Sequence, residues 1–126
     1  MKEQQKNMIE NYVTSYNEFD IDGMLKNLDR KIVFENMSNG KVDFRTEGIL
    51  EFKNQAESAK HYFKQRKQII QSWKFDKQNV TIEIDYKAIL AIDLPNGLKT
   101  GEILEVKGKS EFKFENGKIR SITDKS

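Results

Sequence analysis

The sequence predicts a single α+β domain in which helices pack on an antiparallel sheet. Apolar residues recur at helical spacing near the start of the chain, whereas the second half alternates apolar and polar residues with period two. The chain has 126 residues, which is the usual size of one domain, and no linker or internal repeat divides residues 1–126. We therefore expect one core between the helices and one face of the sheet.

Three helices are expected. The first runs from Glu3 to Glu18, and its apolar stripe contains Met8, Ile9, Tyr12, Val13 and Tyr16. Asp20 is a suitable N-cap for a short second helix, because its carboxylate can accept a hydrogen bond from a free backbone N–H. The third helix is expected from Gly48 to Arg66, with Asn54 as an alternative N-cap for its start.

Six strands are expected around these helices. A first pair, Lys31–Met37 and Lys41–Thr46, is joined by the turn residues Asn39 and Gly40. After the third helix, period-two alternation predicts four long antiparallel strands at Ile69–Phe75, Val80–Leu94, Ile103–Glu115 and Lys118–Asp124.

Composition excludes several classes of function. The formal charge is +2, with basic and acidic residues interleaved, so the basic patch of a nucleic-acid-binding protein is missing. The chain has no cysteine for disulfides or thiolate sites, and its longest apolar run, Ala88–Ile92, is far too short for a membrane span. The glycines are scattered rather than gathered in a phosphate-binding loop. We expect a cytoplasmic protein without a cofactor, a membrane or a nucleic-acid partner.

Two segments carry a resemblance to a known family. Residues Tyr12–Met24 resemble the junction of the first two helices in ketosteroid isomerases and SnoaL-like polyketide cyclases, and residues Phe112–Ile119 resemble their last hairpin. The chain as a whole resembles the nuclear transport factor 2-like superfamily. This resemblance implies a cone-shaped, cystatin-like α+β fold, with three N-terminal helices packed on a curved, mostly antiparallel sheet around a pocket.

The resemblance also allows a test of the isomerase mechanism, which uses an aspartate base and an oxyanion hole made by a tyrosine and a protonated aspartate. Aligned without gaps, these three positions fall on Asn36, Tyr12 and Ser110. An amide cannot take up a proton as a base does. The resemblance therefore implies the pocket but not that mechanism.

Strand pairing predicts which residues face this pocket. A two-residue turn in the last hairpin would place Phe112 opposite Ser121 and Ser110 opposite Thr123, on the inner face. Asp124 would then face outward, opposite Lys109. The candidate ligand-binding residues are Tyr12, Tyr16, Phe34, Asn36, Tyr62, Trp73, Tyr86, Ser110, Phe112 and Thr123.

Alternatives remain open for several of these side chains. The helix tyrosines could pack their rings in the core with locally satisfied hydroxyl groups. Glu35 is expected to face outward, but a slip of one residue in the first strand would bring it inside as a base. His61, the only histidine, lies opposite the apolar face of its helix, so no metal site is expected.

The predicted function is a small-molecule pocket for a neutral, largely apolar ligand, with weak isomerase, lyase or cyclase activity and no assigned catalytic residue. This follows because the predicted inner face has amides, hydroxyls and phenols but no carboxylate, imidazole, lysine or arginine. The alternative is a non-catalytic dimeric interaction module with a filled cone. In either case we expect a homodimer through the outer face of the sheet, where Ile89 and Ala91 interrupt a polar row.

Overall fold

Helices and strands follow one another in the predicted order in the computed structural model, which describes residues 2–95 and 97–126. The helices are α1 (Lys2–Asn17), α2 (Ile21–Leu25) and α3 (Ile49–Ala59), and α3 is followed by the 3-10 turn η1 (Lys60–Tyr62). The strands are β1 (Leu28–Ser38), β2 (Lys41–Glu47), β3 (Phe63–Asp76), β4 (Asn79–Leu90), β5 (Ile103–Glu115) and β6 (Lys118–Lys125).

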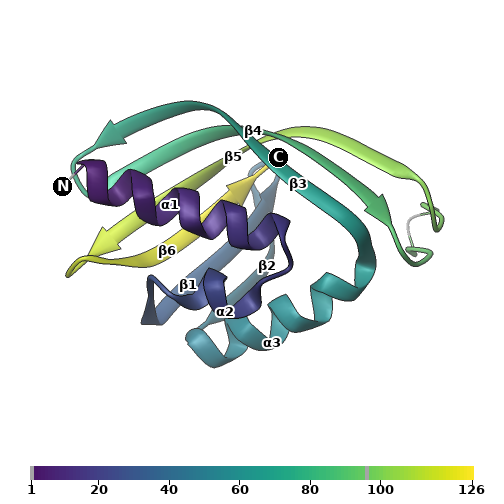
Figure 1. The fold of residues 1–126 in the computed structure, drawn as a ribbon, viewed down its shortest axis with the longest axis horizontal. Coiled ribbons are helices and arrows are strands. Elements are labelled where there is room, and N and C mark those ends of the chain that lie inside the picture. Colours follow the sequence, from purple (N-terminus) through teal and green to yellow (C-terminus); the bar gives the residue numbers. More distant parts are fainter. Residues whose placement is uncertain (1, 96) are drawn as a thin grey trace.

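The strands form one curved sheet in the order β2-β1-β6-β5-β4-β3. The pairing of β1 with β6 is parallel, and the other four pairings are antiparallel, as predicted for the last four strands. The three helices lie on the same, concave side of this sheet (Figure 1). The predicted α+β fold is therefore confirmed.

The start of α2 follows the sequence prediction, whereas the end of α3 does not. Asp20 Oδ1 accepts a hydrogen bond from the backbone N–H of Gly23 at 3.0 Å, which caps α2. The third helix was expected to continue to Arg66, but it ends at Ala59, and residues 63–66 belong to β3. These residues pair with β4, where Phe63 lies opposite Leu90 and Arg66 opposite Ala88. Pairing with a neighbouring strand thus overrides the local preference of this segment.

The strand β4 is shorter than its apolar pattern predicts, because it ends at Leu90 rather than Leu94. Both backbone polar groups of Leu90 bond to the returning chain, its N–H to Glu102 O and its C=O to Gly101 N–H. The following turn is held by Asp93, whose carboxylate accepts hydrogen bonds from the backbone N–H and the hydroxyl of Thr100.

The predicted register of the last hairpin is wrong beyond its first two pairs. Glu115 lies opposite Lys118 and Phe114 opposite Ile119, as expected, but the register then shifts. The shift leaves Arg120 as an extra residue in β6, which is a β-bulge. Past the bulge, Phe112 pairs with Ile122 and Ser110 with Asp124, so the two faces of the end of β6 are exchanged relative to the prediction.

One contiguous core fills the space between α1, α2, α3 and the inner face of the sheet. Its least exposed large side chains are Ile9, Ile32, Val80, Ile82, Phe112, Ile119 and Ile122. Each comes from the apolar side of its element, as helical and period-two spacing require. Among the described residues, no helix is both long enough and apolar enough to cross a membrane.

The outer face of the sheet carries a small apolar patch, which we define as Ile89 and Ile103. Ile89 lies directly opposite Ile103 in the β4–β5 pairing, and 56% of Ile103 is exposed. Ala91, the other residue expected in this patch, lies beyond the end of β4. The homodimer stays a prediction, and this patch is where a second copy would bind.

Replacing Ile89 by Lys is expected to lower the fraction of dimer at a given concentration, because a charge would be desolvated in the contact. Light scattering over a range of concentrations measures this fraction. The matched control is Thr81→Lys, on the same face of β4 but outside the patch. A wild-type protein that stays monomeric at high micromolar concentration would contradict the prediction.

Candidate functional site

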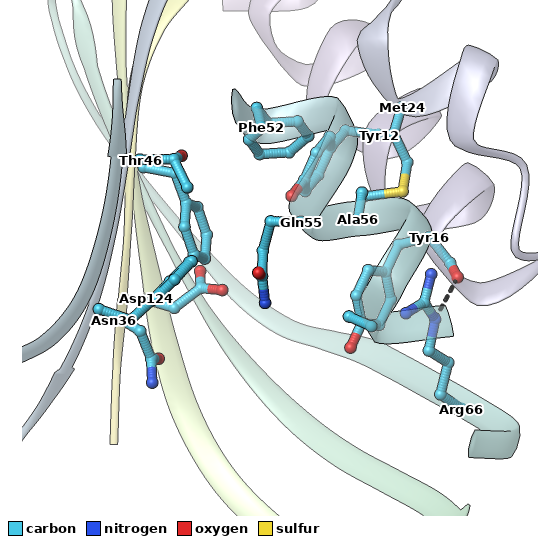
Figure 2. A pocket seen from close by; sticks show the side chains of 13 residues that line it. Tyr12, Tyr16, Met24, Asn36, Thr46, Phe52, Gln55, Ala56, Arg66 and Asp124 are labelled. Carbon is cyan, nitrogen blue, oxygen red and sulfur yellow. Dashed lines mark hydrogen bonds between the residues drawn. The ribbon is translucent and has the colours of Figure 1, made fainter. Parts of the chain in front are cut away.

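A cavity of about 330 Å³ opens between the helices and the concave face of the sheet. It is lined by Tyr12, Tyr16, Met24, Phe34, Asn36, Phe44, Thr46, Phe52, Gln55, Ala56, Ala59, Arg66 and Asp124 (Figure 2). The walls include a cluster of aromatic rings: the Phe34 ring centroid lies 5.8 Å from that of Phe52 and 6.4 Å from that of Phe44. The volume lies at the lower end of the range for small-molecule sites.

Asp124 places a carboxylate in this cavity. It lies in β6 beyond the bulge, beside Asn36 of β1 and opposite Ser110 of β5. Burial raises the pKa of the Asp124 carboxyl from its ordinary 3.8 to about 6, because a charge is costly away from water. The expectation of a pocket without an inward carboxylate is therefore wrong, and Asp124 has the pKa of a useful proton acceptor near neutral pH.

Ser110 holds the Asp124 carboxylate in place. This serine is 2% exposed, and its hydroxyl donates a 2.7 Å hydrogen bond to Asp124 Oδ1. A hydrogen bond to the charged form lowers the pKa of Asp124, but less than burial raises it. Ser110 was predicted to contact a ligand, whereas the structure places it behind Asp124 rather than among the cavity-lining residues.

Tyr12 presents its phenol to the same space. It lies on the buried face of α1, and its ring packs edge-on against Phe112 with centroids 5.9 Å apart. Burial, with the nearby Asp124 carboxylate as a second cause, raises the pKa of Tyr12 well above its ordinary value of 10.0. The phenol is therefore protonated at neutral pH and can donate a hydrogen bond into the cavity.

Tyr16 and Tyr86 form a pair at one end of the cavity. Their hydroxyl oxygens are 2.9 Å apart, and Tyr16 lines the cavity while Tyr86 lies behind it on β4. Burial raises the pKa of both phenols. Tyr16 therefore follows the alternative expectation for the helix tyrosines, because its hydroxyl is hydrogen-bonded to another group of the protein, the Tyr86 hydroxyl.

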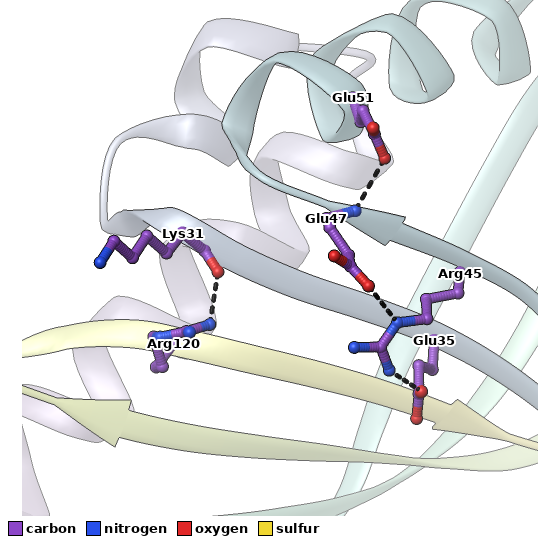
Figure 3. Close-up of polar contacts among 6 residues, drawn as sticks. All are labelled: Lys31, Glu35, Arg45, Glu47, Glu51 and Arg120. Atoms are coloured by element: carbon purple, nitrogen blue, oxygen red, sulfur yellow. Dashed lines mark hydrogen bonds and ion pairs between the residues drawn. The ribbon is translucent and has the colours of Figure 1, made fainter.

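The first strand has the register that places Asn36 inside and Glu35 outside. Asn36 and Phe34 line the cavity, whereas Glu35 accepts a hydrogen bond from Arg45 on the other face of β1. Arg45 also donates to Glu47 at 2.9 Å, so both carboxylates are ion-paired at the surface (Figure 3). Glu35 therefore does not contribute a base to the cavity.

Arg66 places a guanidinium beside the cavity, contrary to the expectation that no arginine faces inward. It is 4% exposed, and its guanidinium carbon lies 3.7 Å from the Tyr16 ring centroid and 4.5 Å from that of Phe19. Its Nε donates a 2.8 Å hydrogen bond to the backbone oxygen of Tyr16, near the end of α1 (Figure 2). Arg66 thus fastens the end of α1 to β3.

Four other predicted candidates lie outside this cavity. Tyr62 is 38% exposed in η1, and Trp73 stacks on Phe75 with ring centroids 5.6 Å apart. Phe112 is buried behind Tyr12. Thr123 lines a depression on the outer face with Glu111 and Lys113, because the bulge in β6 turns it away from the helices.

Metal ligands do not gather in the part of the chain that the structure describes. No group of three or more His, Asp or Glu side chains is arranged to hold an ion there. His61 is exposed in η1, as its helical position predicted. The chemistry available in the cavity is therefore that of Asp124, the phenols, the amides and Arg66.

Two residues that line the cavity, Asp124 and Arg66, are not found by sequence reasoning, and only Asp124 has a signal in the sequence that could reveal it. The apolar residues Ile119 and Ile122 are three apart, so both can face the core only if β6 contains a bulge. That spacing would have predicted the inward position of Asp124. Arg66 has no comparable signal, because it lies in a largely polar stretch that suits either a helix or an edge strand.

No protein-family model matches the chain, and no curated protein matches it in sequence. Solved structures, however, match its fold over nearly the whole chain. A candidate polyketide cyclase from Xanthomonas campestris pv. campestris matches with a TM-score of 0.82 and 16% identity, covering 98% of this chain and 90% of that chain.

Two further solved structures have the same architecture. A candidate SnoaL-like polyketide cyclase from Jannaschia sp. CCS1 matches with a TM-score of 0.78 and 10% identity, over 96% of this chain and 83% of that chain. A nuclear transport factor 2-like protein of unknown function from Burkholderia pseudomallei matches with a TM-score of 0.76 and 12% identity, over 96% of this chain and 88% of that chain. The chain therefore has the nuclear transport factor 2-like fold.

Proposed function

We propose that this protein binds a small, largely apolar carbonyl compound and moves a proton on the carbon next to its carbonyl group. The single observation that carries this proposal is the Asp124 carboxyl, which lies in an aromatic cavity with its pKa raised to about 6. A carboxylate of this pKa accepts protons more readily than an ordinary one, yet is ionised at neutral pH.

The surrounding groups fit the intermediate of such a reaction. When Asp124 takes a proton from the α-carbon, negative charge develops on the carbonyl oxygen, which becomes an enolate. The protonated Tyr12 phenol can donate a hydrogen bond to that oxygen, and the Asn36 amide offers a second donor on the same face of the sheet as Asp124. Return of the proton to another carbon of a conjugated ligand would isomerise it. Attack of the enolate on a second carbonyl would close a ring and form an alkoxide, which would take the proton back from Asp124.

Two further facts favour an enzyme over a module with a filled cone. The cavity is open and reaches Asn36, which a filled cone would not allow. Two of the similar solved structures are described as candidate polyketide cyclases. These support the reaction class without identifying the substrate.

Exchange of the α-hydrogens of 2-tetralone for deuterium tests the proposal without knowledge of the natural substrate. The protein in D₂O is expected to accelerate exchange by about 10²-fold or more over the same concentration of acetate, because the base is positioned beside a hydrogen-bond donor. NMR spectroscopy measures the exchange rate. The rate should rise with pH through about 6 and then level off, since only ionised Asp124 takes up a proton.

Replacing Tyr12 by Phe provides the matching test of the donor, and should slow this exchange while leaving its dependence on pH unchanged. A wild-type protein that exchanges 2-tetralone no faster than acetate would overturn the proposed function. A rate that does not change between pH 4 and 8 would exclude Asp124 as the base.

A further inference from the structure

Two buried side-chain atoms of the described residues have no hydrogen-bond partner, and both belong to residues that line the cavity. They are Thr46 Oγ1 and Arg66 Nη2. Thr46 and Arg66 are 5% and 4% exposed. A buried polar atom without a partner is unfavourable and is rare in folded proteins, so a ligand in this cavity whose polar groups reach these two atoms would be favoured.

The two residues come from opposite edges of the sheet. Thr46 lies on β2 and Arg66 on β3, which are the first and last strands in the sheet order. The curvature of the sheet brings both edges to the same cavity, with Thr46 and Arg66 on opposite sides in Figure 2. A ligand that satisfies both must therefore be polar at two ends.

The contacts that Arg66 makes within the protein leave part of its guanidinium without a hydrogen-bond partner. Stacking against Tyr16 and Phe19 uses its faces, and the hydrogen bond to Tyr16 O uses Nε. Among the residues that the structure describes, no carboxylate forms an ion pair with Arg66, and Asp124 is instead hydrogen-bonded to Ser110. The cation is thus buried without a counter-charge.

We propose that Arg66 binds a carboxylate group of the ligand, so that the substrate is an organic acid with a flat apolar body. This inference rests on the proposed function, because it places the ligand in the same cavity. Among the described residues, Arg66 is the only basic one that lines the cavity, and one guanidinium matches a singly charged carboxylate in geometry and in charge. Thr46 then contacts a hydroxyl or carbonyl group at the other end of the ligand.

Binding of 2-naphthoate, compared with its neutral analogue 2-naphthamide, tests this assignment. Both have the same apolar body, and only the acid can pair with a guanidinium. Titration calorimetry at pH 8 is expected to give at least tenfold tighter binding of the acid. Arg66→Gln should remove this preference while binding of the amide is kept. The matched control is Arg45→Gln, which removes a surface arginine that does not line the cavity.

A measurement on the unaltered protein covers the case in which Arg66→Gln does not fold. The NMR signal of the Arg66 Nε–H group should shift on addition of 2-naphthoate and stay in place with 2-naphthamide. Equal binding of acid and amide would overturn the carboxylate assignment and leave the proposed function standing. A preference that persists in Arg66→Gln would also overturn it, and absence of binding by either compound would count against both proposals.

Discussion

Replacing Asp124 by Asn is expected to reduce α-hydrogen exchange of 2-tetralone by about 10²-fold or more and, at the same time, to stabilise the protein at pH 8. The loss of exchange follows because an amide cannot take up a proton. The gain in stability follows because the charged carboxylate is partly shielded from water, whereas Asn keeps an oxygen that can accept the hydrogen bond from Ser110.

The sign of the pH dependence follows from the direction of the pKa shift. The pKa of Asp124 is about 6 in the folded protein and 3.8 ordinarily, so between these values the folded state binds more protons than the unfolded state. The contribution of the protonated Asp124 carboxyl to the free energy of unfolding is fully present below pH 3.8 and is lost as the pH rises through about 6. Asp124→Asn should therefore raise the free energy of unfolding by about 1 to 3 kcal/mol at pH 8 and change it little at pH 4.

Urea denaturation at both pH values measures these free energies. Glu35→Gln is the matched control, because Glu35 lies on the opposite face of the neighbouring strand in a surface ion pair. This control should leave exchange unchanged and alter stability by less than about 1 kcal/mol. An Asp124→Asn protein that is less stable than the wild type at pH 8 would show that the carboxylate is not desolvated.

Replacing Phe112 by Ala is expected to lower the free energy of unfolding by about 3 to 5 kcal/mol. Phe112 is 1% exposed and lies between β5 and the Tyr12 ring, so its loss removes packed surface and leaves a cavity in the core. Because Phe112 supports Tyr12, the same change should also weaken the hydrogen bond that Tyr12 offers to a ligand.

Tyr62→Ala is the control for this change, since Tyr62 is also aromatic but is 38% exposed on η1. Its truncation should cost less than about 1 kcal/mol, as is usual for surface positions. Chemical denaturation of the two variants gives the comparison. Similar losses for Phe112→Ala and Tyr62→Ala would contradict the placement of Phe112 in the core.

Sequence reasoning predicts the fold well because most of the signal comes from local periodicity. The apolar alternation of Val80, Ile82 and Ile84 identifies a buried strand face, and the structure buries all three side chains. The same alternation in the first strand puts Asn36 inside and Glu35 outside. Short turns then determine which strands are neighbours, as in the observed pairing of Phe75 with Val80.

The candidate site is predicted less well because it depends on single-residue irregularities. One extra residue at Arg120 reverses the faces of Thr123 and Asp124, so an expected hydroxyl is replaced by a carboxylate and the chemistry of the pocket changes. Arg120 also donates a hydrogen bond to the backbone oxygen of Lys31, which links the bulge to β1 (Figure 3). Such a contact between distant parts of the chain has no local sequence pattern.

The end of the third helix is also poorly predicted, because it depends on contacts between distant parts of the chain. The polar segment that contains Arg66 has no strong preference of its own, and its pairing with β4 decides its conformation. The sequence therefore predicts a pocket without charged side chains, whereas the structure places Asp124 and Arg66 at the cavity.

The most direct test of the account is the pKa of the Asp124 carboxyl, measured by NMR titration of its carboxyl carbon and assigned by comparison with Asp124→Asn. An inward, desolvated carboxyl should titrate with a pKa of about 6. Addition of a ligand that excludes water from the cavity should raise this pKa further. A pKa near the ordinary 3.8 would contradict both the inward position of Asp124 and its proposed role as the base.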